Sequence, residues 1–126
     1  MKSVDTNVLV RLITDDEPQQ TSSAERFVRD GVWVSMLALA ETVWVLDSYY
    51  RMAPKDLMDA VEMLLNHRDL VLQDSEAVRA ALDQFRARPS LGFSDCLMLE
   101  MARRAGHLPL GTFDRNLGKL EGVQKL

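Results

Sequence analysis

Short apolar runs alternate with longer segments of helical periodicity along this chain, and that alternation limits the folds open to it. Such runs occupy residues 32–34, 70–72 and 108–112, with further candidates at 2–4 and 123–126. Between them, apolar residues recur every three to four positions, as on one face of a helix. Strands separated by helices pair in parallel. The sequence therefore predicts an α/β fold with a central parallel sheet of four to five strands, covered by helices on both faces as a three-layer sandwich.

Helix-start and helix-stop residues place the expected helices. Ser35 is a candidate N-cap for a helix from Met36 to about Arg51, and Gly106 closes one from Phe93 to Ala105. Asp30-Gly31 is typical of a turn. The other expected helices follow Asn7 or span residues 19–29, 55–67, 75–88 and 114–120.

Composition indicates a single domain over residues 1–126. Cys96 is the one cysteine, which excludes an intramolecular disulfide and fits a reducing compartment. No run of about 18 apolar residues and no secretory signal is present, so we expect a cytoplasmic protein without membrane contact. The net charge of −4 argues against passive coating of nucleic acid. It argues less against a nuclease, because a bound metal adds positive charge where the phosphate must come.

Three aspartates stand at the starts of expected helices: Asp5, Asp95 and Asp114. Asp5 and Asp114 also follow strands, and ligands of open α/β sheets bind beyond the carboxyl ends of the strands. Taken singly, each aspartate is most simply a helix cap or a dipole partner. Thr6 and Ser94 can supply the cap beside Asp5 and Asp95, however, which weakens that explanation in two of the three cases.

Glu41 lies inside the most hydrophobic expected helix. Its neighbours three and four residues away are all apolar, namely Leu37, Ala38, Trp44 and Val45. A carboxylate in such a row is expected to be buried or nearly so, and burial without a partner would cost several kcal/mol. Glu41 is therefore expected either to pair with a buried arginine or to bind a metal.

Four carboxylates in one pocket would repel one another, so their pKa values should rise without a counter-ion. Mg²⁺ or Mn²⁺ suits such oxygen ligands, and the four acids accommodate one ion or two. Asp5, Glu41, Asp95 and Asp114 thus point to a metal-dependent enzyme that cuts phosphodiester bonds. Thr112 can orient a carboxylate or serve as an ordinary strand residue, and Arg115 can reach a phosphate or lie on the surface.

Other side chains have simpler explanations. His67 and His107 stand alone at helix ends, and Cys96 is typical of a small core residue. A receiver domain has a similar length but needs paired acids after its first strand, where only Asp5 stands. A phosphatase of the haloacid dehalogenase type needs a second aspartate at the position of Asn7.

Four segments carry a resemblance to a known family: VDTNVLVRL, AETVWVL, FSDCL and GTFDRNLGKL. Together they resemble PIN-domain proteins, most of all the VapC toxins of bacterial toxin–antitoxin pairs, over essentially the whole chain. The resemblance implies a PIN-like sandwich and an endoribonuclease that cuts single-stranded RNA with Mg²⁺. It also implies a homodimer and an inhibitory VapB-type antitoxin.

Carried over by position, Asp5 and Asp95 match the main metal ligands, Glu41 and Asp114 complete the pocket, and Thr112 supports it. Many relatives carry a further aspartate where this chain has Gly92, which bears on metal affinity rather than on the class of enzyme. A PIN module that only binds a partner is the competing interpretation, although it gives no reason for all four acids.

Overall fold

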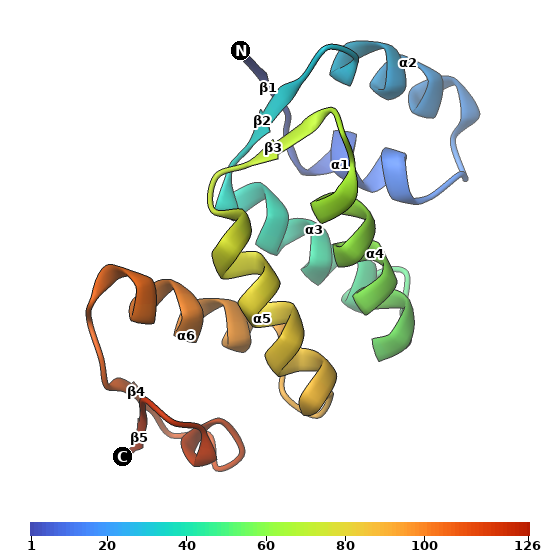
Figure 1. Cartoon of the computed structure of the whole chain (residues 1–126). Helices are drawn as coiled ribbons and strands as arrows, with labels where there is room; N and C mark the ends of the chain where they lie inside the picture. The colour runs from blue at the N-terminus through green and yellow to red at the C-terminus, as the bar shows by residue number, and fades with distance from the viewer. The chain divides into compact units, whose positions relative to one another are not determined.

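The computed structural model describes all 126 residues, and the chain divides into two compact units (Figure 1). Unit 1 comprises Met1–Ser75 and unit 2 comprises Glu76–Leu126. None of the helices combines the length and the apolar character that crossing a membrane requires.

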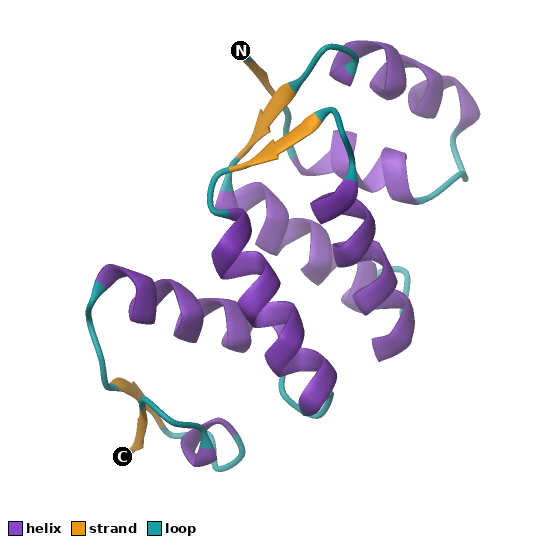
Figure 2. Ribbon diagram, viewed as in Figure 1, coloured by secondary structure: helices purple, strands orange, loops and turns teal.

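Unit 1 holds three parallel strands and four helices. In chain order these are β1 (Lys2–Ser3), α1 (Thr6–Ile13), α2 (Pro18–Val28), β2 (Val32–Val34), α3 (Met36–Ser48), α4 (Pro54–Asn66) and β3 (Leu70–Leu72). The strands lie side by side in the order β1-β2-β3 (Figures 1 and 2). Helix α1 packs against α2 and α3, and α3 packs against α4.

The strands of unit 1 bury one face more completely than the other. Val32 and Val34 are buried, as are Leu70 and Leu72 on the neighbouring strand. Trp33 lies opposite Val71 in the register, and both of these side chains are exposed. The sequence predicts a buried strand at residues 32–34, and that prediction is wrong at Trp33, because side chains alternate between the two faces of a sheet.

Helix α3 begins where the sequence predicts. The Ser35 hydroxyl accepts a hydrogen bond from the Ala38 amide at 3.0 Å, which confirms the predicted N-cap. The helix ends at Ser48, before the expected Arg51. Arg51 has a φ of 54°, in the left-handed region, and such a residue cannot continue a right-handed helix.

Unit 2 holds two helices followed by a small sheet. Its elements are α5 (Ser75–Ala87), α6 (Phe93–Ala105), β4 (Leu110–Thr112), the 3₁₀ turn η1 (Leu117–Lys119) and β5 (Val123–Lys125). Phe85 of α5 and Phe93 of α6 meet edge to face, with ring centroids 6.0 Å apart. Gly106 ends α6 with a φ of 82°, as the sequence predicts.

The α/β class and the parallel pairing are confirmed, but the expected single sheet of four to five strands is not what the hydrogen bonds define. The strands form a sheet of three and a separate sheet of two, β4 with β5 (Figure 2). Strands of two or three residues offer few ladder hydrogen bonds, and β4 pairs with the strand that follows it along the chain.

The helix expected over residues 114–120 is reduced to the short turn η1. The turn runs close to β5, because a Cβ added at Gly118 would lie 2.9 Å from the Cβ of Lys125. Position 118 therefore suits glycine. The strand expected from residue 108 likewise begins only at Leu110.

Candidate functional site

Asp5 lies between β1 and α1 and is the N-cap of that helix. Its Oδ1 accepts a hydrogen bond from the Val8 amide at 3.2 Å. Thr6 lies inside the helix, so the expectation that it can replace Asp5 as the cap is wrong. The cap uses only one carboxylate oxygen of this exposed side chain, which leaves the other available to a ligand.

Glu41 is exposed on α3, which contradicts its expected burial. Leu37 and Trp44, its neighbours on the same face, are 76% and 63% exposed. The helix buries its opposite side through Leu39, Val43 and Leu46. Because α3 is apolar around most of its circumference, the character of the neighbouring residues does not decide which face is buried.

The buried, arginine-paired glutamate of this protein is Glu100 on α6. It is 6% exposed, and its Oε2 accepts a hydrogen bond from Arg103 Nε at 3.1 Å. Gln84 of α5 donates to its other oxygen at 3.4 Å. Pairing of a buried glutamate with an arginine was expected for Glu41. It is found instead at Glu100, which lies one turn from Arg103 on the same helix.

Asp95 is the third residue of α6 and is partly buried. The helix begins after Gly92 without a side-chain cap, so Ser94 does not act as the expected cap. Burial raises the pKa of Asp95, and the negative charge of Asp114 raises that pKa further. A Cβ added at Gly92 would lie 3.8 Å from Asp95 Oδ2, which means that this carboxylate folds back toward the helix start.

Asp114 is held in the turn between β4 and η1. The Thr112 hydroxyl accepts a hydrogen bond from the Asp114 amide at 3.0 Å, and Asp114 Oδ1 accepts one from the Leu117 amide at 2.8 Å. Thr112 therefore positions the backbone of Asp114 and does not bond its carboxylate. As at Asp5, one carboxylate oxygen serves the local turn. Arg115 is exposed beside it.

The four predicted acids thus fall into two pairs. Asp5 and Glu41 belong to unit 1, where Asp5 caps α1 and Glu41 lies on the adjacent helix α3. Asp95 and Asp114 belong to unit 2, where the charge of Asp114 acts on Asp95. No group of three or more His, Cys, Asp or Glu is placed to hold a metal ion. Within unit 2, the carboxylate pair is the feature that suits a hard divalent cation, because such a cation would relieve the repulsion.

The remaining candidates have structural roles. Cys96 is fully buried, and burial, followed by the charges of Asp95 and Glu100, raises the pKa of its thiol to about 11. Such a thiol is not a nucleophile near neutral pH. His67 Nδ1 accepts a hydrogen bond from the Asp69 amide at 3.1 Å, within the turn that leads to β3.

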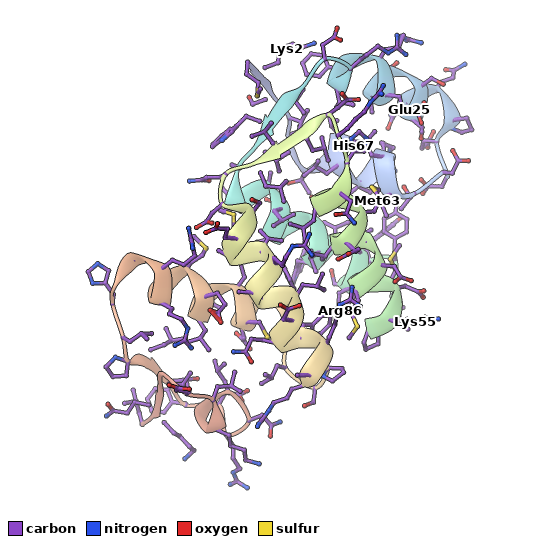
Figure 3. The ribbon with its side chains drawn as sticks, viewed as in Figure 1. Lys2, Glu25, Lys55, Met63, His67 and Arg86 are labelled. Atoms are coloured by element: carbon purple, nitrogen blue, oxygen red, sulfur yellow. The ribbon has the colours of Figure 1, made fainter.

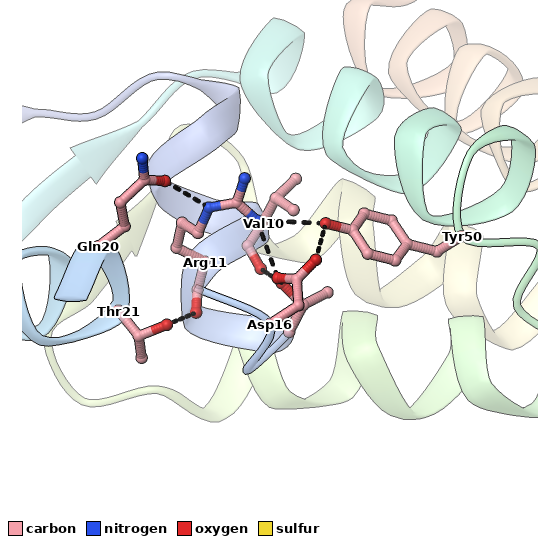
Figure 4. A network of polar contacts seen from close by, with 7 residues as sticks. Val10, Arg11, Asp16, Gln20, Thr21 and Tyr50 are labelled. Atoms are coloured by element: carbon pink, nitrogen blue, oxygen red, sulfur yellow. Dashed lines mark hydrogen bonds and ion pairs between the residues drawn. The ribbon is translucent and has the colours of Figure 1, made fainter. Parts of the chain in front are cut away.

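Unit 1 contains a polar network that was not predicted from the sequence (Figure 4). Arg11 forms an ion pair with Asp16 at 3.0 Å. The Tyr50 hydroxyl accepts a hydrogen bond from Arg11 at 3.2 Å and donates one to Asp16 at 3.0 Å. The tyrosine raises the pKa of Arg11 and lowers that of Asp16. Tyr50 lies 34 residues from Asp16, so no local spacing could have revealed the contact.

Comparison with known proteins identifies the class. The PIN domain model matches residues 2–123, and the chain belongs to the PIN domain family. A VapC ribonuclease of Aquifex aeolicus (strain VF5) is 25% identical over 126 aligned positions, covering 95% of this chain and 92% of that protein. No solved structure matched the chain. The family resemblance is therefore confirmed, and the receiver and phosphatase alternatives are set aside.

Proposed function

We propose that this protein is a VapC-type toxin, an endoribonuclease that hydrolyses phosphodiester bonds of single-stranded RNA with Mg²⁺, or with Mn²⁺ in its place. The full-length PIN match and the VapC ribonuclease relative support a nuclease of this kind. The observation that carries the proposal is the Asp95–Asp114 pair: burial raises the pKa of Asp95, and the negative charge of Asp114 raises it further. Protein structures tolerate such a pair where a cation or a proton balances it.

Asp5, Glu41, Asp95 and Asp114 are the residues that would hold the metal, with Asp5 and Asp95 as the main ligands. When bound, a divalent ion acidifies a water and neutralises the phosphate. Thr112 fixes the turn that carries Asp114. Arg115 directly follows Asp114 and would bind a phosphate oxygen of the substrate. This assignment requires residues 1–126 to act as one PIN domain.

The proposal includes partners. The inhibitor would be a VapB-type antitoxin, the working form a homodimer, and the location the cytoplasm, where RNA substrates occur. Expression without the antitoxin should arrest growth, and expression of Asp95→Asn should not. Normal growth with the unchanged protein at an equal level would favour a PIN module that only binds a partner.

The direct test uses purified protein and single-stranded RNA. Mg²⁺ should support internal cleavage, chelation should stop it, and Asp95→Asn should reduce it by at least about a hundredfold. Mg²⁺ should also raise the melting temperature of the unchanged protein, because a ligand of the native state stabilises it.

The Asp95→Asn protein is expected to stay folded. Burial and Asp114 already disfavour the charge on Asp95, so its removal should not lower the melting temperature without metal. If this variant cleaves RNA at the original rate, the site assignment is wrong.

A further inference from the structure

Two cavities of unit 1 open along helices α1 and α2 and lead away from Asp5. The first, of about 480 Å³, is lined by Asp5, Ser3, Val4, Val8 and Phe27. The second, of about 520 Å³, shares Val8 and Phe27 with the first and continues toward Arg11. The two cavities adjoin at Val8 and Phe27, and together they are called the groove; the first of them reaches Asp5, a proposed metal ligand.

Phe27 supplies an aromatic surface to both parts of this groove. The side chain is 43% exposed although it belongs to α2, whose Ala24 and Val28 are buried. Lys2 Nζ lies 4.3 Å from the centroid of the Phe27 ring and donates to the Phe27 carbonyl at 2.8 Å. A cation is therefore held beside an exposed aromatic ring, within the unit that carries Asp5.

The lining of the groove carries little charge of its own. The chain has 19 Asp and Glu residues, yet Asp5 is the one carboxylate that lines either cavity. Glu25, labelled in Figure 3, lies on α2 but does not line them. The charge of Arg11 is matched by Asp16 at 3.0 Å. The cation that remains for an anion is Lys2, which lines neither cavity but contacts Phe27.

Amide side chains line the second cavity and can read a base. Gln20 Oε1 already accepts from Arg11 Nε at 2.7 Å. The amides of Asn7 and Gln19 line the same cavity without a hydrogen bond to another residue. Each such amide offers both a donor and an acceptor, as the edge of a nucleobase requires.

We infer that the groove between α1 and α2 binds the nucleotide next to the cleaved bond, with its base stacked on Phe27 and its phosphate beside Lys2. This inference rests on the proposed function and names a substrate subsite for it. The stacking would tolerate every base, because each base has a flat face. Asn7 and Gln19 would add a preference through its edge.

Binding, rather than cleavage, gives the test. Short labelled single-stranded RNA is titrated without metal into Asp95→Asn protein that carries a second change at position 27. Phe27→Leu keeps apolar bulk but loses the ring, and should weaken binding about tenfold. Phe27→Tyr keeps the ring and should bind within about twofold of the parent. Melting curves confirm that both variants are folded.

Two lysine substitutions, one in a contact with Phe27 and one elsewhere, test the phosphate contact. Lys2→Gln should reduce the dependence of log K on log salt concentration by about 0.7, the value for one phosphate of a single strand. Lys55→Gln is the matched control, because Lys55 is an exposed lysine of α4 outside the groove (Figure 3). Its slope should equal that of the parent.

The possible results separate the two proposals. If Phe27→Leu binds RNA like the parent, the subsite is wrong. If the unchanged protein does not cleave RNA but Phe27→Leu and Lys2→Gln both lose binding as expected, the proposed enzyme activity fails, while the nucleotide contact of the groove stands. An equal loss of slope in Lys2→Gln and Lys55→Gln would also overturn the phosphate contact.

Discussion

Asp5 and Asp114 each combine a local structural task with a proposed chemical one. In both, one carboxylate oxygen accepts a backbone hydrogen bond at the start of a turn or helix. That bond restricts the rotamer and thus directs the second oxygen. A cap and a metal ligand are therefore compatible roles for one aspartate, and substitutions can separate them.

Two changes at Asp5 separate these roles. Asp5→Asn keeps an acceptor for the Val8 amide but loses the charge, so cleavage should fall at least about a hundredfold with little change in stability. Asp5→Ala should lose cleavage as well and destabilise the fold by about 1 kcal/mol through the missing cap. RNA cleavage assays and denaturant unfolding measure the two effects. Equal stability of the two variants would contradict the cap.

At the scale of elements, the Arg11–Asp16–Tyr50 network joins α1 to the chain just after α3. Thr14 Oγ1 adds a further hydrogen bond to Asp16 at 3.0 Å. Asp5 caps α1 and α3 carries Glu41, so the network connects the two helices next to the proposed metal ligands of unit 1. It thereby fixes how these two helices pack.

Tyr50→Phe should lower the melting temperature by a few degrees at neutral pH, because it removes hydrogen bonds to Asp16 and Arg11. The folded state lowers the pKa of Asp16, so its stabilisation is present above the unfolded value near 4 and is lost as the pH falls through the lower folded value. The difference between the two proteins should therefore shrink in acid. Tyr49→Phe, at a neighbouring exposed tyrosine, is the control. A constant difference across this range would contradict the network.

At the scale of the whole molecule, the proposed enzyme needs acids from both units to serve one reaction. Glu41 comes from unit 1 and Asp114 from unit 2. If the two acids complete one metal pocket, removal of either already damages that pocket. The second substitution should then lower the cleavage rate less in the variant than in the unchanged protein.

Glu41→Gln and Asp114→Asn test this requirement together. The double variant should cleave RNA clearly faster than the product of the two single-variant rate ratios predicts. Asp47→Asn replaces an exposed acid elsewhere on α3 and is the control, whose effect should multiply independently with that of Asp114→Asn. Simple multiplication for Glu41 as well would indicate that the two acids work at separate places.

Local sequence patterns determined the elements of this protein. The Ser35 cap, the Gly106 stop and the strands at residues 32–34 and 70–72 all depend on neighbours within a few positions, and all are confirmed. The four acids could be found in the same way, because each stands in a short motif and the motifs together indicated the PIN family.

Tertiary structure alone decided which residues are buried and which contacts are distant. It exposed Glu41 and buried Glu100, because an apolar helix such as α3 does not specify its inner face. It separated the strands into two sheets and joined Tyr50 to Asp16. These outcomes depend on which surfaces pack together. That packing involves residues far apart in the chain, so a local sequence pattern cannot predict it.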